Sequence, residues 1–255
     1  MRRSILLAAV AAFALSSAAC MGGMGVQTPP DPASYAAALA DPSRPADDRA
    51  RDAARHTAET LAFARVRPGQ KIADLIIGGG YFTRVFAAAV GPEGRVTAWQ
   101  PAEFIAFMAS YGDSLTAVDA LANVDGIRSP AAAPDLPMGL DLAFTAQNYH
   151  DLHLRQSGAD TASRVNAAVF RALKPGGLYV VIDHHAVAGS PLTAADTVHR
   201  IDIEAVKREV LAAGFVLDGE SDVLANPADP LTASVFDASI RGRTSQFMLR
   251  FRKPG

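Results

Sequence analysis

The chain has 255 residues, of which 49% are apolar and 20% are charged, the balance of an ordinary globular protein. This composition excludes a disordered or fibrous protein, and the length suits one domain of typical size after removal of a short leader. The 24 basic residues nearly cancel the 26 acidic ones, and no polybasic run exists, so the sequence does not favour a nucleic-acid partner.

The first residues carry the pattern of a secretion signal. Arg2 and Arg3 give a positive start, an apolar run follows over residues 5–15, and small residues at 16–19 precede Cys20. The apolar run is too short to span a bilayer permanently. Two processing routes fit: plain cleavage at the small residues, or lipidation of the cysteine as the first residue of a bacterial lipoprotein. A single cysteine at this place favours lipidation.

This reading divides the chain into three parts. We expect a signal peptide over residues 1–19, a tether over residues 20–46 and one domain over residues 47–255. The tether is expected because its first part is rich in Gly, Pro and Met and has no period. The protein is then exported, and it lies in the periplasm or is held on the bacterial envelope by a lipid anchor at Cys20.

Beyond the tether, helical and strand-like segments alternate, which is typical of βαβ units around a mainly parallel sheet. The expected helices cover residues 47–64, 82–90, 102–122, 161–173 and 203–213. The expected strands cover residues 71–77, 95–99, 123–127, 140–146, 178–182, 215–217 and 246–252. The last two strands form a closing pair, and the final one alternates apolar and polar residues.

Three glycines, Gly78 to Gly80, separate the first buried strand from the following helix. Glycines let the backbone approach a ligand, and the start of a helix offers free N–H groups and the positive end of its dipole. The arrangement therefore fits a site for an anionic or polar cofactor. A glycine turn of this kind also occurs where a strand and a helix merely pack tightly.

The segment from Lys71 to Thr83 resembles the first motif of class I S-adenosylmethionine-dependent methyltransferases, in which an acidic residue on the first strand, here Asp74, precedes a glycine-rich turn. Lys174–Gly177 resembles the same family's turn into the fifth strand. Further segments are similar to a group of bacterial predicted methyltransferases, many of them exported. These segments are Asn148–Asp151, Asp183–His184, His199–Asp202 and residues 241–254, and the whole resemblance covers residues 47–254.

The resemblance implies a Rossmann-like α/β fold: a seven-stranded, mostly parallel sheet with the last strand antiparallel and helices on both faces. It also implies that S-adenosylmethionine lies across the carboxyl ends of the strands, where open α/β sheets bind ligands. The implied cofactor-binding residues are Asp74, Gly78, Gly79, Gly80, Tyr81, Thr83 and Gln100.

Two residues depart from the family pattern. Ile76 stands where the glycine loop usually begins, and Gln100 stands where the second strand usually ends in Asp or Glu. An acidic side chain there accepts both ribose hydroxyls, whereas an amide carries no charge. Charge-assisted hydrogen bonds are roughly twice as strong as neutral ones, so we expect cofactor binding weaker by about 1–2 kcal/mol.

Five of the six histidines follow the fourth expected strand, and His150 and His184 each lie at the carboxyl end of a strand. Histidine exchanges a proton near neutral pH, and an adjacent carboxylate can orient it. We expect His150 to act as general base with Asp151 orienting it, while Asn148 and Tyr149 shape the acceptor site. His184 is the second choice for the base.

Simpler roles compete with this reading. Asp151 would serve equally well to cap the following helix, and His199 with Asp202 would form a loop-to-helix cap. No residue is assigned as a metal ligand, although a metal site remains an alternative. Its nitrogen and oxygen ligands would come from His150, Asp151, His153, Asp183, His184 and His185, but their spacing matches no firm metal signature.

Upstream of the first strand, Arg51, Asp52 and Arg55 share a helix that covers the cofactor pocket in the resembling group. They would clamp the methionine carboxylate of the cofactor or an anionic substrate, or else form a solvated helix face.

The sequence thus favours methyl transfer from S-adenosylmethionine to an unknown small-molecule or envelope acceptor. The second hypothesis is a catalytically inactive envelope protein of the same fold that binds a small ligand, since fold alone does not settle function. Export supports this second hypothesis, because the methyl donor is made in the cytoplasm. The third hypothesis is a metal-dependent hydrolase.

Overall fold

The computed structural model describes residues 28–255. The expected signal peptide, Cys20 and the first part of the tether lie outside these residues. Within residues 28–255, no helix combines the length and the apolar character that crossing a bilayer requires.

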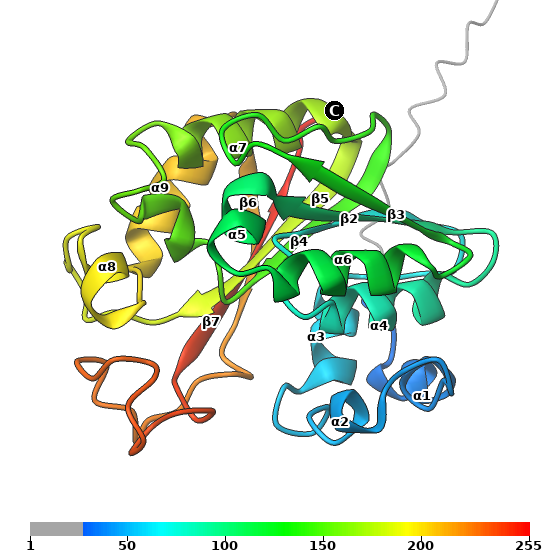
Figure 1. Ribbon diagram of the computed structural model, residues 1–255, viewed down its shortest axis with the longest axis horizontal. Coiled ribbons are helices and arrows are strands. Elements are labelled where there is room, and N and C mark those ends of the chain that lie inside the picture. The colour runs from blue at the N-terminus through cyan, green and yellow to red at the C-terminus, as the bar shows by residue number, and fades with distance from the viewer. Residues whose placement is uncertain (1–27) are drawn as a thin grey trace, which may run out of the picture.

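A seven-stranded sheet forms the centre of the molecule, in the order β3-β2-β1-β4-β5-β7-β6 (Figure 1). β7 runs antiparallel to both of its neighbours, β5 and β6, and the other neighbouring pairs are parallel. The fold class expected from the sequence is therefore confirmed. The strands are β1 (Lys71–Leu75), β2 (Arg95–Pro101), β3 (Val124–Ser129), β4 (Leu140–Ala146), β5 (Leu173–His184), β6 (Val216–Ser221) and β7 (Gln246–Arg252).

Helices cover both faces of this sheet (Figure 1). One face carries α3 (Thr57–Phe63), α4 (Tyr81–Val90) and α6 (Ser110–Asp119), and the other carries α7 (Thr161–Ala172) and α9 (Ile203–Ala212). The shorter helices are η1 (Pro32–Tyr35), α1 (Ala36–Leu39), α2 (Ala46–Arg49), α5 (Ala102–Phe107), η2 (His150–His153) and α8 (Ala194–Val198).

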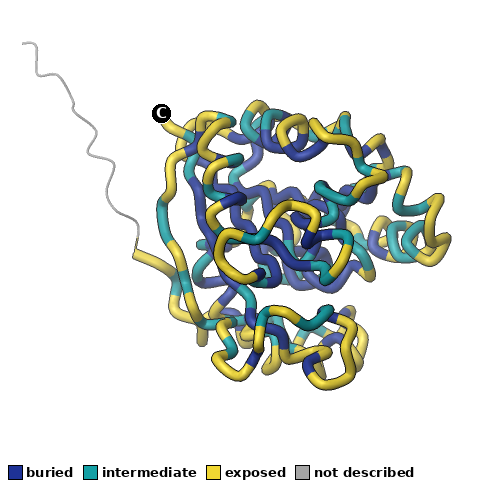
Figure 2. The backbone as a smooth tube through the Cα atoms, turned by 90° about the vertical axis from the view of Figure 1, so that its left-hand side faces the viewer, coloured by how far each residue is buried: buried dark blue, intermediate teal, exposed yellow. Residues whose placement is uncertain are grey.

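The two faces bury separate apolar clusters, because side chains alternate along each strand. On β4, Leu142 and Phe144 join the cluster under α4, whereas Ala143 between them joins the cluster under α7 and α9. Figure 2 shows the consequence: the buried backbone runs through the middle of the molecule, and the exposed segments surround it. The sheet is therefore a rigid frame for the loops at its carboxyl edge.

The folded part of the chain begins before residue 47, within the segment expected as a tether. The Tyr35 side chain is buried, and its hydroxyl donates a hydrogen bond to the carbonyl of Val66 over 2.7 Å. The guanidinium of Arg44 forms an ion pair with Asp52. The alanine-rich sequence around Tyr35 concealed this anchoring side chain.

Two expected helices are divided in the structure. The helix expected over residues 47–64 is divided into α2 and α3 by a turn segment over residues 50–56, which ends at His56 with a left-handed backbone of φ 43°. The helix expected over residues 102–122 is divided into α5 and α6 at Met108, whose backbone is extended. The fifth strand is longer than expected, because β5 also includes the turn Lys174–Gly177.

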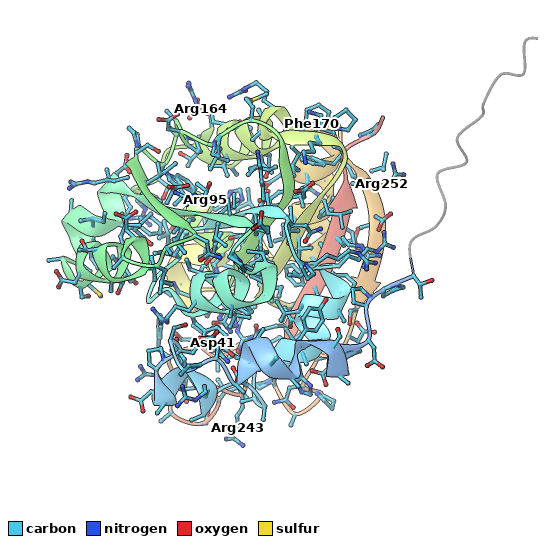
Figure 3. The ribbon with its side chains drawn as sticks, turned by 90° about the vertical axis from the view of Figure 1, so that its right-hand side faces the viewer. Asp41, Arg95, Arg164, Phe170, Arg243 and Arg252 are labelled. Atoms are coloured by element: carbon cyan, nitrogen blue, oxygen red, sulfur yellow. The ribbon has the colours of Figure 1, made fainter. Side chains whose placement is uncertain are left out.

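The arginines occupy two kinds of position. Most lie at the surface, as Arg164 and Arg243 do (Figure 3), but Arg200 is fully buried. Its guanidinium pairs with Asp229 over 2.9 and 3.0 Å, and Asp229 is itself buried. This ion pair fastens the long connection between β6 and β7 (orange to red in Figure 1) to the segment that follows α8.

Candidate functional site

A cleft opens at the carboxyl ends of β1, β2 and β4. β1 and β4 are the neighbouring strands at which the order of the sheet reverses, the place where open α/β sheets bind ligands. The cleft is lined by Arg51, Arg55, Asp74, Ile76, Ile77, Gly78, Gly79, Tyr81, Phe82, Gln100, Phe104, Tyr111, Ala146, Gln147, Asn148 and Asp151.

The three glycines of the loop have different surroundings. Gly78 and Gly79 line the cleft, and a Cβ atom added at either would meet no other atom within 4 Å. A Cβ on Gly80 would lie 2.6 Å from Cγ1 of Val118, so Gly80 serves close packing against α6. Only the first two glycines therefore form an open cradle in which a ligand can approach the backbone.

Ile76 precedes this cradle and has a left-handed backbone with φ 55°. A β-branched residue is a rare outlier in this conformation, which glycine adopts freely. The loop thus keeps a glycine-type path although the glycine is missing. The side-chain amide of Asn148 supports the turn by donating to the carbonyl of Ile76 over 2.6 Å.

Gln100 faces the same loop from the end of β2. Its Oε1 accepts a hydrogen bond from the main-chain N–H of Gly78 over 3.0 Å. Its Nε2 is buried and has no hydrogen-bond partner among residues 28–255. A buried amide donor without a partner costs roughly 1–3 kcal/mol, so a ligand acceptor that met it would be stabilised.

Asp74 and Thr83 are joined by a hydrogen bond, in which the threonine hydroxyl donates to Asp74 Oδ2 over 2.6 Å. Burial raises the pKa of the Asp74 carboxyl to about 7, although the hydrogen bonds from Thr83 lower it. Asp74 reaches the cleft wall, but Thr83 is fully buried and is not among the cleft residues. Thr83 therefore positions Asp74 and does not itself line the cleft.

The upstream arginines and Tyr81 form the opposite wall. Arg55 stacks on the ring of Tyr81, with 4.6 Å from its guanidinium carbon to the ring centroid. Arg51 pairs with Asp48, whereas Arg55 has no carboxylate within ion-pair distance among the described residues. Burial lowers the pKa of Arg55, and the nearby charge of Arg51 lowers it further. The Arg55 guanidinium donates to Gln147 Oε1 over 3.3 Å, and a guanidinium without a carboxylate partner in the described part of the chain is suited to a carboxylate ligand.

Asp52 lies away from the cleft. It accepts hydrogen bonds from Arg44 and from the hydroxyl of Tyr81, and these interactions hold α2 and α3 on the start of α4. Arg51, Asp52 and Arg55 therefore lie in the turn segment between α2 and α3 and not on the expected helix, and this segment is built into the site and is not a solvated face.

His150 lies behind the cleft wall. Its Nδ1 is 2.8 Å from Asp183 Oδ1, and its main-chain N–H donates to the other oxygen of the same carboxylate over 2.7 Å. Burial alone would lower the pKa of His150, but the charge and hydrogen bond of Asp183 outweigh it and raise the pKa. His150 is 3% exposed and does not line the cleft, whereas Asp151 does.

Of the neighbours His150 and Asp151, it is Asp151 that lines the cleft. Burial raises its pKa to about 6, although the charge of His150 opposes this shift. Its Oδ1 lies 3.3 Å from Nε2 of His150. The expected arrangement is thus reversed in space: Asp151 faces the cleft, and His150 stands behind it.

Tyr149 and His153 point to the other face of the sheet. The hydroxyl of Tyr149, which is fully buried, donates to Glu209 Oε2 over 2.9 Å and accepts from Asn166 over 2.8 Å. His153 Nε2 lies 3.0 Å from the same Glu209 oxygen. Both residues fasten η2 to α7 and α9, so Tyr149 does not shape the cleft as expected.

His184 is also held away from the cleft, with its Nδ1 2.8 Å from the hydroxyl of Thr244. Burial lowers its pKa to about 4, against the opposing charge of Asp183. Asp202 is the N-cap of α9, accepting a hydrogen bond from the N–H of Glu204, as the simpler interpretation expected. Of the six residues in the metal alternative, only His150 and Asp151 share a group of possible ligands, and His199 completes that group.

Several cleft residues were not expected from the sequence. Phe104, Tyr111 and Gln147 come from α5, α6 and the end of β4, and no motif marks them. Trp99 lies inside the core, where its indole N–H donates to Ser129 Oγ over 2.8 Å, and it does not obstruct the cleft.

Known proteins similar to this chain include methyltransferases. The chain is 32% identical over 133 residues to the ubiquinone/menaquinone biosynthesis C-methyltransferase UbiE of Cupriavidus metallidurans. This match covers 50% of this chain and 49% of that protein, so the chain spans about half the length of the curated relatives it matches. No family model matches the chain.

Solved structures match over most of the domain. A SAM-dependent methyltransferase from Aquifex aeolicus aligns with a TM-score of 0.55 and 19% identity, over 88% of this chain and 98% of that one. The chain has the class I methyltransferase fold. The [4+2]-cyclase SpnF aligns with a TM-score of 0.57 and 19% identity, over 79% of this chain and 81% of its own. The class I methyltransferase fold therefore does not by itself specify the reaction, which must be argued from the site.

Proposed function

We propose that the cleft binds S-adenosylmethionine and that the protein transfers its methyl group to a small-molecule or envelope acceptor. One observation carries the proposal: the open cradle of Gly78 and Gly79 adjoins the buried Nε2 of Gln100, which has no hydrogen-bond partner within residues 28–255. A nucleoside ribose would occupy the cradle, and one of its hydroxyl oxygens would accept the hydrogen bond from Gln100. The residues present therefore fit the cofactor that the fold implies.

The other end of the cleft suits the amino-acid part of this cofactor. Arg55 supplies a cation without a carboxylate partner in the described part of the chain, stacked on Tyr81. A guanidinium binds a carboxylate through paired hydrogen bonds. We assign the methionine carboxylate to Arg55, with Tyr81 holding the guanidinium in place.

The bound cofactor supplies an electrophilic methyl group on a sulfonium sulfur. Held by Gln100 and Arg55, it would supply this methyl group to an acceptor nucleophile, which would release its proton. The protein contributes chiefly by holding the reactants in line. We place the acceptor at the edge of the cleft formed by Asp151, because this carboxylate is held in place from behind by His150 and Asp183.

A second function, ligand binding without methyl transfer, is favoured by Ile76. Its side chain lines the cleft where the family pattern has glycine, and Gln100 lacks the charge of the usual acidic residue. Both changes weaken the binding of a ribose. This second function shares its ligand with the first, but no methyl transfer follows binding.

Isothermal titration calorimetry of the full chain with S-adenosylmethionine and with its demethylated product tests the proposal. We expect micromolar binding that Gly78→Arg abolishes, because the new side chain fills the cradle. Gly176→Arg is the matched control: Gly176 also has a positive φ and open space, but it lies in the turn at the start of β5, away from the cleft. Absence of binding at millimolar ligand, or equal loss in both variants, would refute the proposal.

We further propose that the protein is exported and anchored through Cys20. The support is the sequence pattern of residues 2–20, which lie outside the described residues. Mass spectrometry of the mature amino terminus should find a lipidated Cys20 as the first residue. A terminus that retains residues 1–19 would contradict export, and an unmodified cysteine would contradict the anchor.

A further inference from the structure

A second group of chemically active side chains lies at the edge of the cleft. His150, Asp151 and His199 each offer one ligand atom, and these three atoms lie within 4.8 Å of one another. His150 and Asp151 come from η2, and His199 is the residue that ends α8. Because Asp151 also lines the cleft, the group touches the place where the proposed function puts the acceptor.

The separation of two of these atoms matches a metal site better than a hydrogen bond. His150 Nε2 and Asp151 Oδ1 are 3.3 Å apart. A charge-assisted N–H···O bond is typically about 2.7–2.9 Å long. Two ligands on a tetrahedral zinc ion, each about 2.1 Å from the metal, are about 3.4 Å apart.

Asp183 orients His150 in the way that metal-binding histidines require. Its Oδ1 lies 2.8 Å from Nδ1 of His150, so Nε2 is the nitrogen left for a ligand. The carboxylate is fixed in turn, because it also accepts main-chain N–H groups of His150 and His184, each over 2.7 Å. A carboxylate behind the second ring nitrogen is the usual support of a metal-ligating histidine.

The ring of His199 packs on the other side of the group. Its ring stands at 89° to that of His150, with 5.4 Å between the centroids, and it also contacts the ring of Phe236 at 4.8 Å. The next residue, Arg200, is fully buried and bound to Asp229 and to the carbonyls of His185 and Ala233. A ligand held this firmly loses little freedom when it binds an ion.

We propose that His150 Nε2, the Asp151 carboxylate and His199 bind a divalent transition-metal ion of the zinc type. Two histidines and one carboxylate form a known catalytic zinc ligand set, which leaves a fourth position free. That fourth position would lie on the cleft side of the ion, because Asp151 lines the cleft. The ion site itself does not depend on the proposed function, but its role does: the ion would hold the acceptor's oxygen or nitrogen and favour release of its proton to solvent.

Zinc binding to the untagged, chelator-treated full chain tests the site in the absence of S-adenosylmethionine. Calorimetry should find one zinc ion per chain at micromolar affinity or tighter. His199→Ala should weaken binding at least tenfold, and Asp183→Asn should weaken it about 10- to 100-fold by releasing the ring of His150. His56→Ala is the control, because His56 is a half-exposed histidine beside Glu59 and remote in sequence from the group.

A spectroscopic measurement separates ligation from surface binding. Cobalt(II) in the wild-type protein should give the intense visible absorption of a four-coordinate site, and His199→Ala should lose it while its thermal unfolding stays cooperative. Absence of zinc binding would overturn the proposal, as would equal loss of affinity in His199→Ala and His56→Ala. Because no methyl donor is present, these outcomes are independent of whether the cleft binds S-adenosylmethionine.

Discussion

The side-chain amide of Asn148 donates a hydrogen bond to the main-chain carbonyl of Ile76, with 2.6 Å between Nδ2 and O. The Oδ1 of the same amide accepts from the hydroxyl of Thr145, which fixes the orientation of the group. The segment that follows β4 thereby supports the strained turn at the end of the neighbouring strand β1. Asn148, expected from the sequence to shape the acceptor site, thus supports the turn that precedes the glycine loop.

Asn148→Ala should destabilise the protein and weaken binding of S-adenosylmethionine together. The substitution leaves the carbonyl of Ile76 without its partner, and an unpaired buried polar group costs roughly 1–3 kcal/mol. Thermal unfolding and calorimetry measure the two effects. Asn166→Ala is the matched control, because it removes a buried amide that is bonded to Tyr149 away from the cleft. Asn166→Ala should lower the stability and leave the affinity for S-adenosylmethionine unchanged. If Asn148→Ala also leaves this affinity unchanged, Asn148 does not support the binding site.

Ile76→Gly should strengthen S-adenosylmethionine binding at little cost in stability. The left-handed backbone at φ 55° costs an L-residue roughly 1–2 kcal/mol, which glycine avoids. The lost burial of an isoleucine side chain, about 1.5–3 kcal/mol, slightly exceeds this gain, so the net destabilisation is about 0.5–1 kcal/mol. Removal of a side chain from the cleft wall also enlarges the space for the ligand.

Ile77→Gly separates these contributions. Ile77 is buried and lines the same cleft, but its backbone is not among those with positive φ. Its replacement loses burial without any relief of strain, so it should destabilise the protein more than Ile76→Gly does. Chemical denaturation measures both. Equal destabilisation by the two substitutions would show that the left-handed turn stores no strain.

The sheet could be predicted from the sequence because its signals are local. Apolar runs such as residues 140–146 and glycine or proline turns mark the strands, and the observed strand agrees with this range. The division of the helices at His56 and Met108 could not be predicted in this way. At His56 the break accompanies contacts with distant residues, since Asp52 is bound to Arg44 and to Tyr81 on α4.

The site shows the same limit at the level of single side chains. Sequence order placed Tyr149, His150 and Asp151 together, but in the short helix η2 successive residues point in different directions. Tyr149 consequently enters the core under α7, Asp151 faces the cleft, and His150 lies between Asp183 and Asp151. The position of His199 depends on the next residue, Arg200. Arg200 forms a buried ion pair with Asp229, which is far away in the sequence.

Gln100→Glu should tighten binding of S-adenosylmethionine about tenfold, which corresponds to about 1.4 kcal/mol. The carboxylate would still accept the N–H of Gly78, as Oε1 does now, and its second oxygen would accept a ribose hydroxyl with a charge-assisted bond. The substitution also removes the buried donor that has no partner in the described residues. Calorimetry of Gln100→Leu provides the comparison, because leucine removes both interactions and should weaken binding. If Gln100→Glu binds no more tightly than the wild type, the ribose does not lie at this residue.

Asp74 should make the stability of the protein fall as the pH rises from about 4 to about 7. The folded-state pKa of its carboxyl is raised to about 7, mainly by burial, whereas an unfolded aspartate titrates near about 3.9. Between these values the folded protein holds a proton that the unfolded chain has released, so the free energy of unfolding decreases with increasing pH. Below this range both states are protonated, and above it both are ionised, so the contribution of Asp74 no longer changes.

Two substitutions isolate this contribution. Asp74→Asn should remove it, so the difference in unfolding free energy between variant and wild type should change with pH only between about 4 and 7. Thr83→Val removes the hydrogen bond to Oδ2 that favours the ionised form, so it should extend the fall in stability to higher pH. Urea denaturation of the three proteins at a series of pH values measures these differences. Parallel curves for wild type and Asp74→Asn would mean that Asp74 titrates alike in the folded and unfolded states, contrary to its burial beside the glycine loop.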